Sequence, residues 1–479
     1  MNSLKRQTIN GVAWSAVERF SVQGTQFVLS IILARLVAPA EYGLIAMLAI
    51  FIAIAQCFVD SGFSNALIQK KDRNNVDIST IFYFNIVVSL GIYGILFLLA
   101  PYIADFYRVP VLVVICRILG LDVILNSFAL AQRTILQINV DFKRLTGISF
   151  ISVIVSGLLG VFFAWKGMGV WALLIQRVVN TFLQTLLLWI TSSWRPLCVF
   201  SKESFKGLFS FGSKLLLGGL LHNIFMNLYP LIIGRYFTPI NVGFFNRAQQ
   251  FAAFPSNTIV GIVTRVSYPL LCKMQDDITH MEDAQLRMIR SIALVVFPLM
   301  TGFAILAEPI IRVLLTDEWL PAAPMLSILC LSYMWYPVMQ QNWQLLNVRG
   351  RSDLALKAEF IKKIVALILL FGSIPFGIKA VCISLVIYSF CDMFIILMFV
   401  RKITSIGFRA EGKALLPICT ITAIMGGCVW GIKACIHIPM FTLLVGILVG
   451  AFVYLFLIYI ICLPERKMLV KLIRKGNYE

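Results

Sequence analysis

Ala34-Arg35-Leu36-Val37-Ala38-Pro39-Ala40-Glu41-Tyr42-Gly43 joins two long apolar runs near the N-terminus, and Gly234-Arg235-Tyr236-Phe237-Thr238-Pro239-Ile240-Asn241-Val242-Gly243 does the same near the middle of the chain. Both stretches share the frame Arg-x3-Pro-x3-Gly, and weaker matches continue after each of them at nearly the same offset. Two copies of one helical bundle in a membrane protein are typical of transporters, whose substrate site lies between the copies.

The composition predicts an all-α integral membrane protein. The chain of 479 residues is 60% hydrophobic and 13% charged, which is more apolar surface than a soluble protein can bury. Apolar runs long enough to cross a hydrocarbon core of about 30 Å recur along the whole length and predict about 14 transmembrane helices. We expect them near residues 11–34, 42–63, 79–100, 111–133, 147–165, 169–191, 210–233, 242–268, 290–312, 322–347, 358–376, 379–400, 413–434 and 438–462.

These spans predict three parts: an N-terminal six-helix lobe over residues 1–200, a C-terminal six-helix lobe over 201–405, and two accessory helices with a basic cytoplasmic tail over 406–479. Because each lobe has an even number of helices, both start on the same side of the membrane, and the repeats are parallel. No cleavage site precedes the first span, so we expect no removable signal peptide. The longest polar stretch, residues 272–290, predicts a surface helix between two spans.

The charge distribution predicts a membrane orientation. The net charge of +19 could indicate nucleic acid as a partner, but Lys and Arg concentrate in alternate loops, as the positive-inside rule requires, and we expect no nucleic acid. This bias places both termini in the cytoplasm. The loop and terminal cations on that side include Lys70, Arg73, Arg349, Lys362 and Lys363. The basic tail is expected to rest against anionic headgroups of membrane lipids.

Charged side chains inside predicted spans are costly, at about 2.5–3.5 kcal/mol each at mid-membrane, and therefore indicate function or internal pairing. The cations Arg19, Arg117, Arg177, Lys214 and Arg247 outnumber the acids Glu18, Asp122 and Asp392. A cavity with surplus positive charge suits an anion, and guanidinium groups match phosphate geometry. The candidate substrate-binding residues are Arg19, Lys214, Arg247, Arg177, Arg117, Asn246, Gln340 and Asn342. The candidates for cation coupling are Glu18, Asp122 and Asp392. Structural pairing between helices is the alternative for each of these charges.

The sequence contains no motif of a soluble enzyme or an ATPase. We find no Walker A sequence, H-E-x-x-H, G-x-S-x-G or Rossmann fingerprint. The eleven cysteines include no C-x2-C pair and predict no metal site. We therefore expect a transporter without a cofactor, and not an enzyme.

Four motifs in order carry a family resemblance: Gly11-Val12-Ala13-Trp14-Ser15, Ala34-Arg35-x3-Pro39-x2-Tyr42-Gly43, Asp60-Ser61-Gly62-Phe63, and Gly243-Phe244-Phe245-Asn246-Arg247-Ala248-Gln249 with Pro255 downstream. With these motifs the chain resembles the MOP superfamily, and within it the bacterial polysaccharide flippases of the Wzx or WzxC type.

The resemblance implies a MATE-like fold with two lobes around a central cavity that opens alternately to each side of the bacterial inner membrane. It implies a polyprenyl-pyrophosphate-linked oligosaccharide as substrate, for O-antigen, capsule or exopolysaccharide biosynthesis. Polysaccharide polymerase and glycosyltransferases are then candidate partners. Of the candidate residues, we transfer only Arg247 from the family to this chain, because it lies inside a matching motif.

Two other functions stay open on the sequence alone. One is a transporter of the same fold for another substrate, such as a drug, a cation or lipid II. The surplus of buried cations argues against a drug-cation exporter. The other is a membrane polysaccharide polymerase or ligase, which the short loops and the two-fold repeat do not favour.

The predicted orientation can be tested by cysteine labelling. After the native cysteines are replaced, a thiol introduced as Asp72→Cys or Asp276→Cys should react only when reagent reaches the cytoplasmic side, because these loops carry the excess of Lys and Arg. Reaction from outside intact cells at either position would contradict the orientation.

Overall fold

The computed structural model describes residues 21–60, 62–70, 72–274, 277–436 and 438–460. These residues form helices and no strands, and they divide into two compact units, Met1–Gly243 and Phe244–Glu479. The N-terminal motif Gly11–Ser15 and the basic tail after residue 460 lie outside the described residues. The prediction of an all-helical chain is confirmed.

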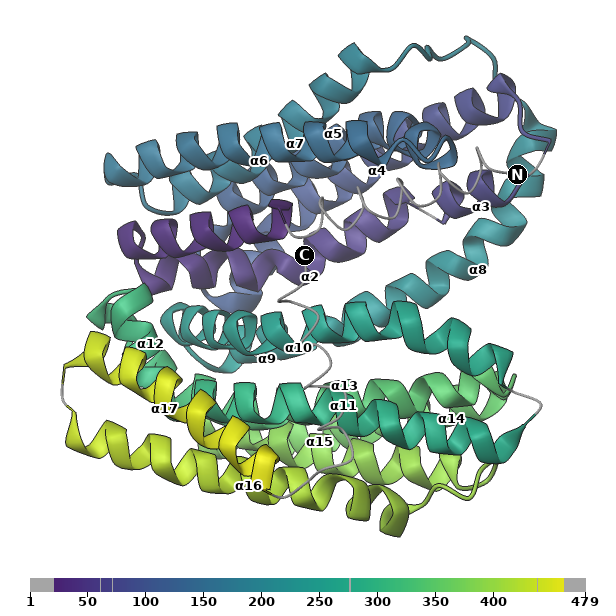
Figure 1. The fold of residues 1–479 in the computed structure, drawn as a ribbon. Coiled ribbons are helices and arrows are strands. Elements are labelled where there is room, and N and C mark those ends of the chain that lie inside the picture. The colour runs from purple at the N-terminus through teal and green to yellow at the C-terminus, as the bar shows by residue number, and fades with distance from the viewer. Residues whose placement is uncertain (1–20, 61, 71, 275–276, 437, 461–479) are drawn as a thin grey trace, which may run out of the picture. The chain divides into compact units, whose positions relative to one another are not determined.

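The first unit contains eight numbered helices after the helical segment Ser21–Leu36 (Figure 1). Helices α4 to α7 pack as neighbours, and α2 contacts both this group and the pair α8 and α9. The helices are α2 (Pro39–Asp60), α3 (Phe63–Gln69), α4 (Asn75–Tyr107), α5 (Leu112–Ile138), α6 (Phe142–Trp165), α7 (Val170–Thr191), α8 (Lys202–Met226) and α9 (Leu228–Tyr236).

The second unit is built from the helices that follow, and α10 starts within the last residues of the first unit. Helix α13 packs against α11 and α15, and the two accessory helices α16 and α17 pack on α11 and α12. The elements are α10 (Pro239–Lys273), α11 (Ile278–Ile305), α12 (Ala307–Leu314), η1 (Asp317–Trp319), α13 (Ala322–Val348), α14 (Ser352–Ser373), η2 (Ile374–Phe376), α15 (Ile378–Val400), α16 (Phe408–Cys435) and α17 (Pro439–Ile460).

Within the described residues, ten helices are long and apolar enough to cross a membrane, so the protein is a multi-pass membrane protein. An eleventh crossing arises if Leu216–Met226 and Leu228–Tyr236, which meet at a bend of 42°, count as one broken span. Pro230 contributes to this bend because it cannot donate a hydrogen bond to the preceding turn. The count of fourteen stays a prediction. The separate surface helix predicted over 272–290 is wrong, because α10 continues to Lys273 and α11 begins at Ile278.

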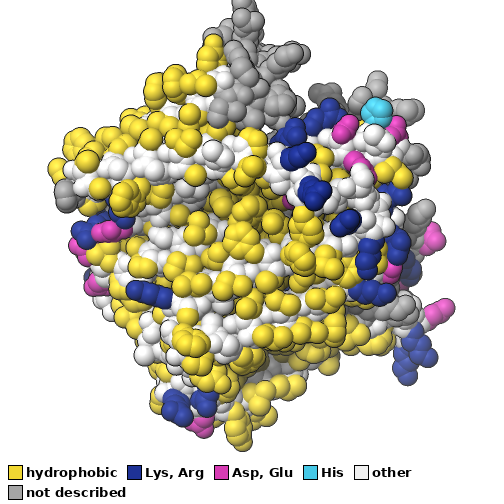
Figure 2. All heavy atoms as spheres, turned by 90° about the horizontal axis from the view of Figure 1, so that it is seen from below, with side chains coloured by type: hydrophobic (Ala, Val, Ile, Leu, Met, Phe, Trp, Pro, Cys, Tyr) yellow, Lys and Arg dark blue, Asp and Glu magenta, His cyan; other side chains and the backbone are white. Residues whose placement is uncertain are grey.

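The surface has the character expected in lipid. Figure 2 shows one face on which hydrophobic side chains cover the middle, while Lys and Arg gather mainly along one edge. Large exposed apolar side chains are found on most of the long helices, for example Leu98, Ile190 and Leu448. Because burial inside the protein cannot account for these residues, the hydrocarbon of a bilayer is the environment that covers them.

The repeated sequence motif forms a close backbone contact within the first unit. Pro39 and Pro239 each begin a long helix, a position that proline favours because its missing N–H has no partner there. A Cβ atom added at Gly43 would lie 1.8 Å from the carbonyl oxygen of Pro239, and one added at Gly243 would lie 2.0 Å from that of Pro39. The motif therefore needs glycine in both copies so that the two helix starts can touch.

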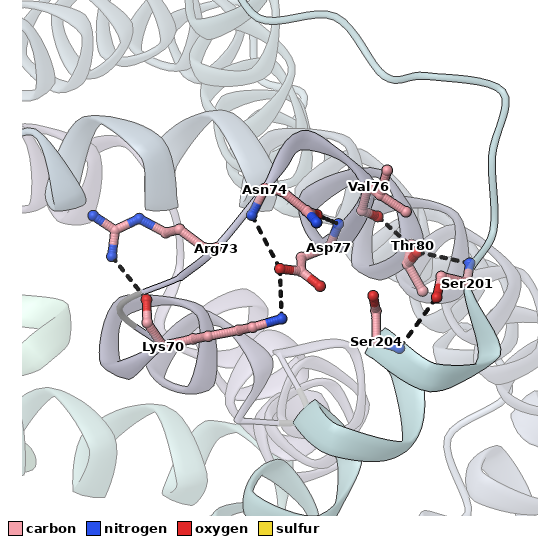
Figure 3. Close-up of polar contacts among 8 residues, drawn as sticks. All are labelled: Lys70, Arg73, Asn74, Val76, Asp77, Thr80, Ser201 and Ser204. Atoms are coloured by element: carbon pink, nitrogen blue, oxygen red, sulfur yellow. Dashed lines mark hydrogen bonds and ion pairs between the residues drawn. The ribbon is translucent and has the colours of Figure 1, made fainter.

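The segment that leads from α7 to α8 is fastened to the start of α4 (Figure 3). Asn74 and Asp77 form a capping box at the N-terminus of α4, and Lys70 pairs with Asp77 at 2.7 Å. The hydroxyl of Thr80 accepts a hydrogen bond from the backbone N–H of Ser201 at 3.1 Å, and that of Ser79 accepts one from Leu197 at 2.9 Å. Residues 197–201 of the connection between the predicted lobes are thus held against the start of α4 by hydrogen bonds.

We expect Gly43→Ala to destabilise the protein, because its new methyl group would meet the backbone of Pro239 and overpacking costs about 1–3 kcal/mol. Gly91→Ala is the matched control, since nothing lies within 4 Å of the corresponding Cβ position in α4. The measurement is the melting temperature of the purified protein in detergent. Equal melting temperatures for the two variants would contradict the proposed contact.

Candidate functional site

Three of the predicted site residues cannot be placed in full. Glu18 and Arg19 lie outside the described residues. The backbone of Lys214 belongs to α8, but its side chain is outside the described part. Their proposed roles in anion binding and cation coupling stay predictions.

Arg247 lies two turns into α10 and its side chain is buried, with 3% exposed. Its guanidinium carbon is 5.3 Å from the centre of the Trp319 ring, and its Nη1 donates to Gln250 Oε1 at 3.3 Å. Gln250 in turn donates to Asn246 Oδ1 at 2.8 Å, so the two predicted residues of this motif are linked through Gln250. The face of an aromatic ring attracts a cation, so the indole of Trp319 stabilises this guanidinium.

Asp122 and Arg177 form an ion pair between α5 and α7 in the first unit. Arg177 Nε is 2.7 Å from Asp122 Oδ2, and the Asp122 side chain is almost fully buried while 40% of the Arg177 side chain is exposed. Arg117, five residues before Asp122, instead places its guanidinium carbon 4.0 Å from the centre of the Phe97 ring on α4. Arg117 and Asp122 each have a partner on another helix, which is the alternative that the sequence left open for them.

Asn342 belongs to a buried polar network that crosses four helices of the second unit. Its amide nitrogen lies 3.1 and 3.0 Å from the two carboxyl oxygens of Glu411 on α16. Gln285 of α11 donates to Asn342 at 3.4 Å and exchanges hydrogen bonds with Gln341. Ser267 of α10 extends the network to Gln341 at 3.1 Å.

Gln340, also a predicted site residue, lies beside this network. With Gln341 and Thr264 it lines a shallow recess between α10, α11 and α13, which has otherwise apolar walls. The recess encloses no space that would hold a water molecule, whereas a typical ligand pocket has roughly 300–1,000 Å³. The recess alone therefore does not define a substrate site.

Asp392 forms an ion pair with Lys362, a residue that the sequence analysis counted among the cytoplasmic cations. Lys362 Nζ lies 3.1 Å from Asp392 on α15 and 2.6 Å from Glu359 on its own helix. Lys362 was expected among the cations of the cytoplasmic loops and span ends; α14 begins ten residues earlier at Ser352 and carries this side chain into the bundle, where 8% remains exposed.

Sequence reasoning missed two of these buried charges for the same reason. The predicted spans begin at 358 and 413, whereas the helices begin at Ser352 and Phe408, so Glu411 falls before its predicted span and Lys362 falls close to the start of its own. A helical wheel of the longer segments would have placed both on the same faces as apolar residues such as Ala355 and Leu415.

Comparison with known proteins identifies the family. A family model described as "Polysaccharide biosynthesis protein" matches residues 32–324, and the chain belongs to this family. It is 28% identical to the teichuronic acid biosynthesis protein TuaB of Bacillus subtilis over the full length of both chains. It is 24% identical to the lipopolysaccharide biosynthesis protein WzxC of Escherichia coli, over 75% of this chain and 74% of that one.

Solved structures show the same fold. A lipid II flippase MurJ in an inward closed conformation matches 96% of this chain and 100% of its own with a TM-score of 0.77 and 14% identity. An inward-facing multidrug transporter of the MATE family in the MOP superfamily matches 82% of this chain and 97% of its own with a TM-score of 0.64 and 15% identity. The predicted MATE-like fold is confirmed.

The ion pair between Asp122 and Arg177 predicts an asymmetric effect on stability. Arg177→Gln leaves a buried carboxylate without its cation and should cost about 3 kcal/mol or more. Asp122→Asn leaves a guanidinium that is already 40% exposed and should cost about 1 kcal/mol or less. Melting temperatures of the two purified variants test this order. The reverse order of melting temperatures would contradict this prediction, because it would show that Arg177 is the charge that is more costly to leave without its partner.

Proposed function

We propose that this protein moves a polyprenyl-pyrophosphate-linked oligosaccharide from the cytoplasmic to the outer face of a bacterial inner membrane. The observation that carries the proposal is the full-length match to a teichuronic acid biosynthesis protein, together with the family match over residues 32–324. Surface polysaccharides are assembled from precursors that are larger and more polar than a bilayer tolerates. A multi-pass protein of this family without a sequence motif for ATP use fits that transfer step.

The fold supports a mechanism by alternating access. A lipid II flippase with the same fold is recorded as inward closed, and MATE transporters with it are recorded as inward-facing and outward-facing. In such folds two bundles rock about a site near the middle of the membrane. We propose that residues 1–200 and 201–405 are the moving lobes here, that both termini are cytoplasmic, and that a polymerase and glycosyltransferases work beside the transporter.

We propose that Arg247, with Arg19 and Lys214, contacts the pyrophosphate. The guanidinium contacts Trp319 and Gln250, and its planar set of N–H groups can make a bidentate contact with phosphate oxygens. Because 3% of Arg247 is exposed, the contact requires a conformation in which this side chain is uncovered, and alternating access supplies such a conformation.

A drug or cation antiporter is the second candidate, because MATE transporters share the fold. The two functions differ in what accumulates when the gene is deleted. Loss of a flippase should leave the lipid-linked oligosaccharide in the cytoplasmic leaflet and remove surface polysaccharide. Loss of an antiporter should instead raise sensitivity to organic cations and leave the polysaccharide unchanged.

The variants Arg247→Ala and Arg247→Lys test the phosphate contact in such a deletion strain. Each charge-assisted hydrogen bond contributes about 1.5–3 kcal/mol, so Arg247→Ala should lower affinity by about ten- to hundredfold. Arg247→Lys keeps the charge but loses the planar fork, so it should restore polysaccharide only in part.

Membrane abundance of each variant is the control, because a purely structural Arg247 predicts low protein level. Wild-type polysaccharide from Arg247→Ala at normal abundance would contradict the site.

A further inference from the structure

The first unit has a row of polar side chains that extends beyond the ion pair between Asp122 and Arg177, and we call this row the polar stripe. We define the stripe as Gln56 of α2, Asn126 and Arg133 of α5, and Arg177, Asn180 and Gln184 of α7. Three contacts join the helices along it. Asn126 donates to Gln56 at 2.7 Å, Arg133 donates to Gln184 at 3.2 Å, and Arg177 pairs with Asp122 at 2.7 Å.

The stripe residues of α7 lie in the middle part of this membrane-spanning helix. Helix α7 has 22 residues, which span about 33 Å at about 1.5 Å per residue. Arg177 and Gln184 then lie about 10 and 21 Å from its first residue. Polar side chains at this depth are costly if they face hydrocarbon, so they must face protein or water.

The stripe faces away from lipid yet is not buried. The exposed apolar residues of α7 are Phe182, Leu186 and Ile190. At about 100° per residue they lie about 140–220° around the helix from Arg177, whereas Asn180 and Gln184 lie within about 60° of it. Even so, 40% of the Arg177 side chain is exposed, and the rest of the stripe is half-buried.

Unused hydrogen-bonding capacity points to a ligand. The side-chain carbonyl oxygen of Asn180, which lies between Arg177 and Gln184 on the helix, is itself buried and has no hydrogen-bond partner among the described residues, although the residue as a whole is half-buried. By contrast, Ser89 and Ser127 of the same unit are fully buried and bonded to each other at 3.0 Å. A row of amides and guanidiniums that is half-accessible within the bundle has the donors and acceptors that sugar hydroxyls require.

We infer that the polar stripe binds the glycan part of the transported lipid. This inference rests on the proposed flippase function, and it assigns the sugars, not the pyrophosphate, to these residues of the first unit. Amide side chains bond hydroxyl groups of many arrangements, so the stripe favours a hydroxyl-rich oligosaccharide over a bare lipid pyrophosphate.

A comparison of two ligands tests the inference. The probes are the lipid-linked oligosaccharide extracted from cells that lack this gene and the same polyprenyl pyrophosphate without sugars. Wild-type protein in lipid nanodiscs should bind the glycan-bearing lipid more tightly. The double variant Asn180→Leu/Gln184→Met should lose that preference by about two- to tenfold for each hydrogen bond removed, while binding of the bare lipid stays unchanged.

Ser127→Ala is the matched control, because it removes a hydroxyl that is buried in the same bundle but outside the stripe. An unchanged ligand preference in the double variant would overturn the inference and leave the flippase proposal intact. Failure of the wild type to bind either lipid would instead overturn the proposed function.

Thiol labelling decides the matter if the double variant folds poorly. Asn180→Cys should react with a charged thiol reagent, and Phe182→Cys should not, with each site resolved by mass spectrometry of its peptide. Bound glycan-bearing lipid should protect Asn180→Cys more than the bare lipid does. No reaction at Asn180→Cys, or equal protection by both lipids, would overturn the inference.

Discussion

The structure depends on one constraint: inside a hydrocarbon layer, every charged or polar side chain needs a partner within the protein or a place that water can reach. Each buried charge described above meets it in a different way. Asp122 is paired across helices with Arg177, and Lys362 lies between Glu359 and Asp392. Glu411 accepts hydrogen bonds from Asn342, while Arg247 and Arg117 lie over aromatic rings. These contacts help to hold the helices of each unit together. The hydrophobic effect contributes little to helix association inside a membrane, because lipid tails are as apolar as leucine side chains.

The same constraint explains what the sequence could and could not predict. Helix positions follow from apolar length, so spans such as 169–191 and 379–400 match α7 (Val170–Thr191) and α15 (Ile378–Val400) closely. Helix starts were predicted too late where charges occur in the first turn, as with Glu411 in α16 and Asp353 in α14. The sequence left pairing between helices open for Asp122, but it could not identify Arg177 as the partner, because periodicity within one helix says nothing about which neighbour packs against it. The contact between Gly43 and Pro239 was likewise visible only as a repeated motif.

The structure contains two kinds of polar cluster, one that is buried and one that is partly accessible. The network from Glu411 to Ser267 is buried and bonded internally, which fits a role in joining α10, α11, α13 and α16. The stripe on α2, α5 and α7 is half-accessible and retains an unpartnered amide oxygen at Asn180. If the pyrophosphate is held by cations and the sugars by amides, specificity for one oligosaccharide can change through the stripe without loss of the common anion contact. That division would allow related proteins to share a fold and a lipid carrier while they transport different glycans.

The central claim is that this chain alone moves a lipid-linked oligosaccharide across a bilayer. Purified protein reconstituted into liposomes, with the extracted lipid-linked oligosaccharide placed in both leaflets, tests it directly. A glycan-cleaving enzyme added outside cuts only the outer pool. The account predicts that liposomes with the protein, given a proton or sodium gradient where needed, let the enzyme consume nearly all of the substrate, whereas protein-free liposomes stop at about half. A plateau at about half with correctly folded protein under each gradient would contradict it.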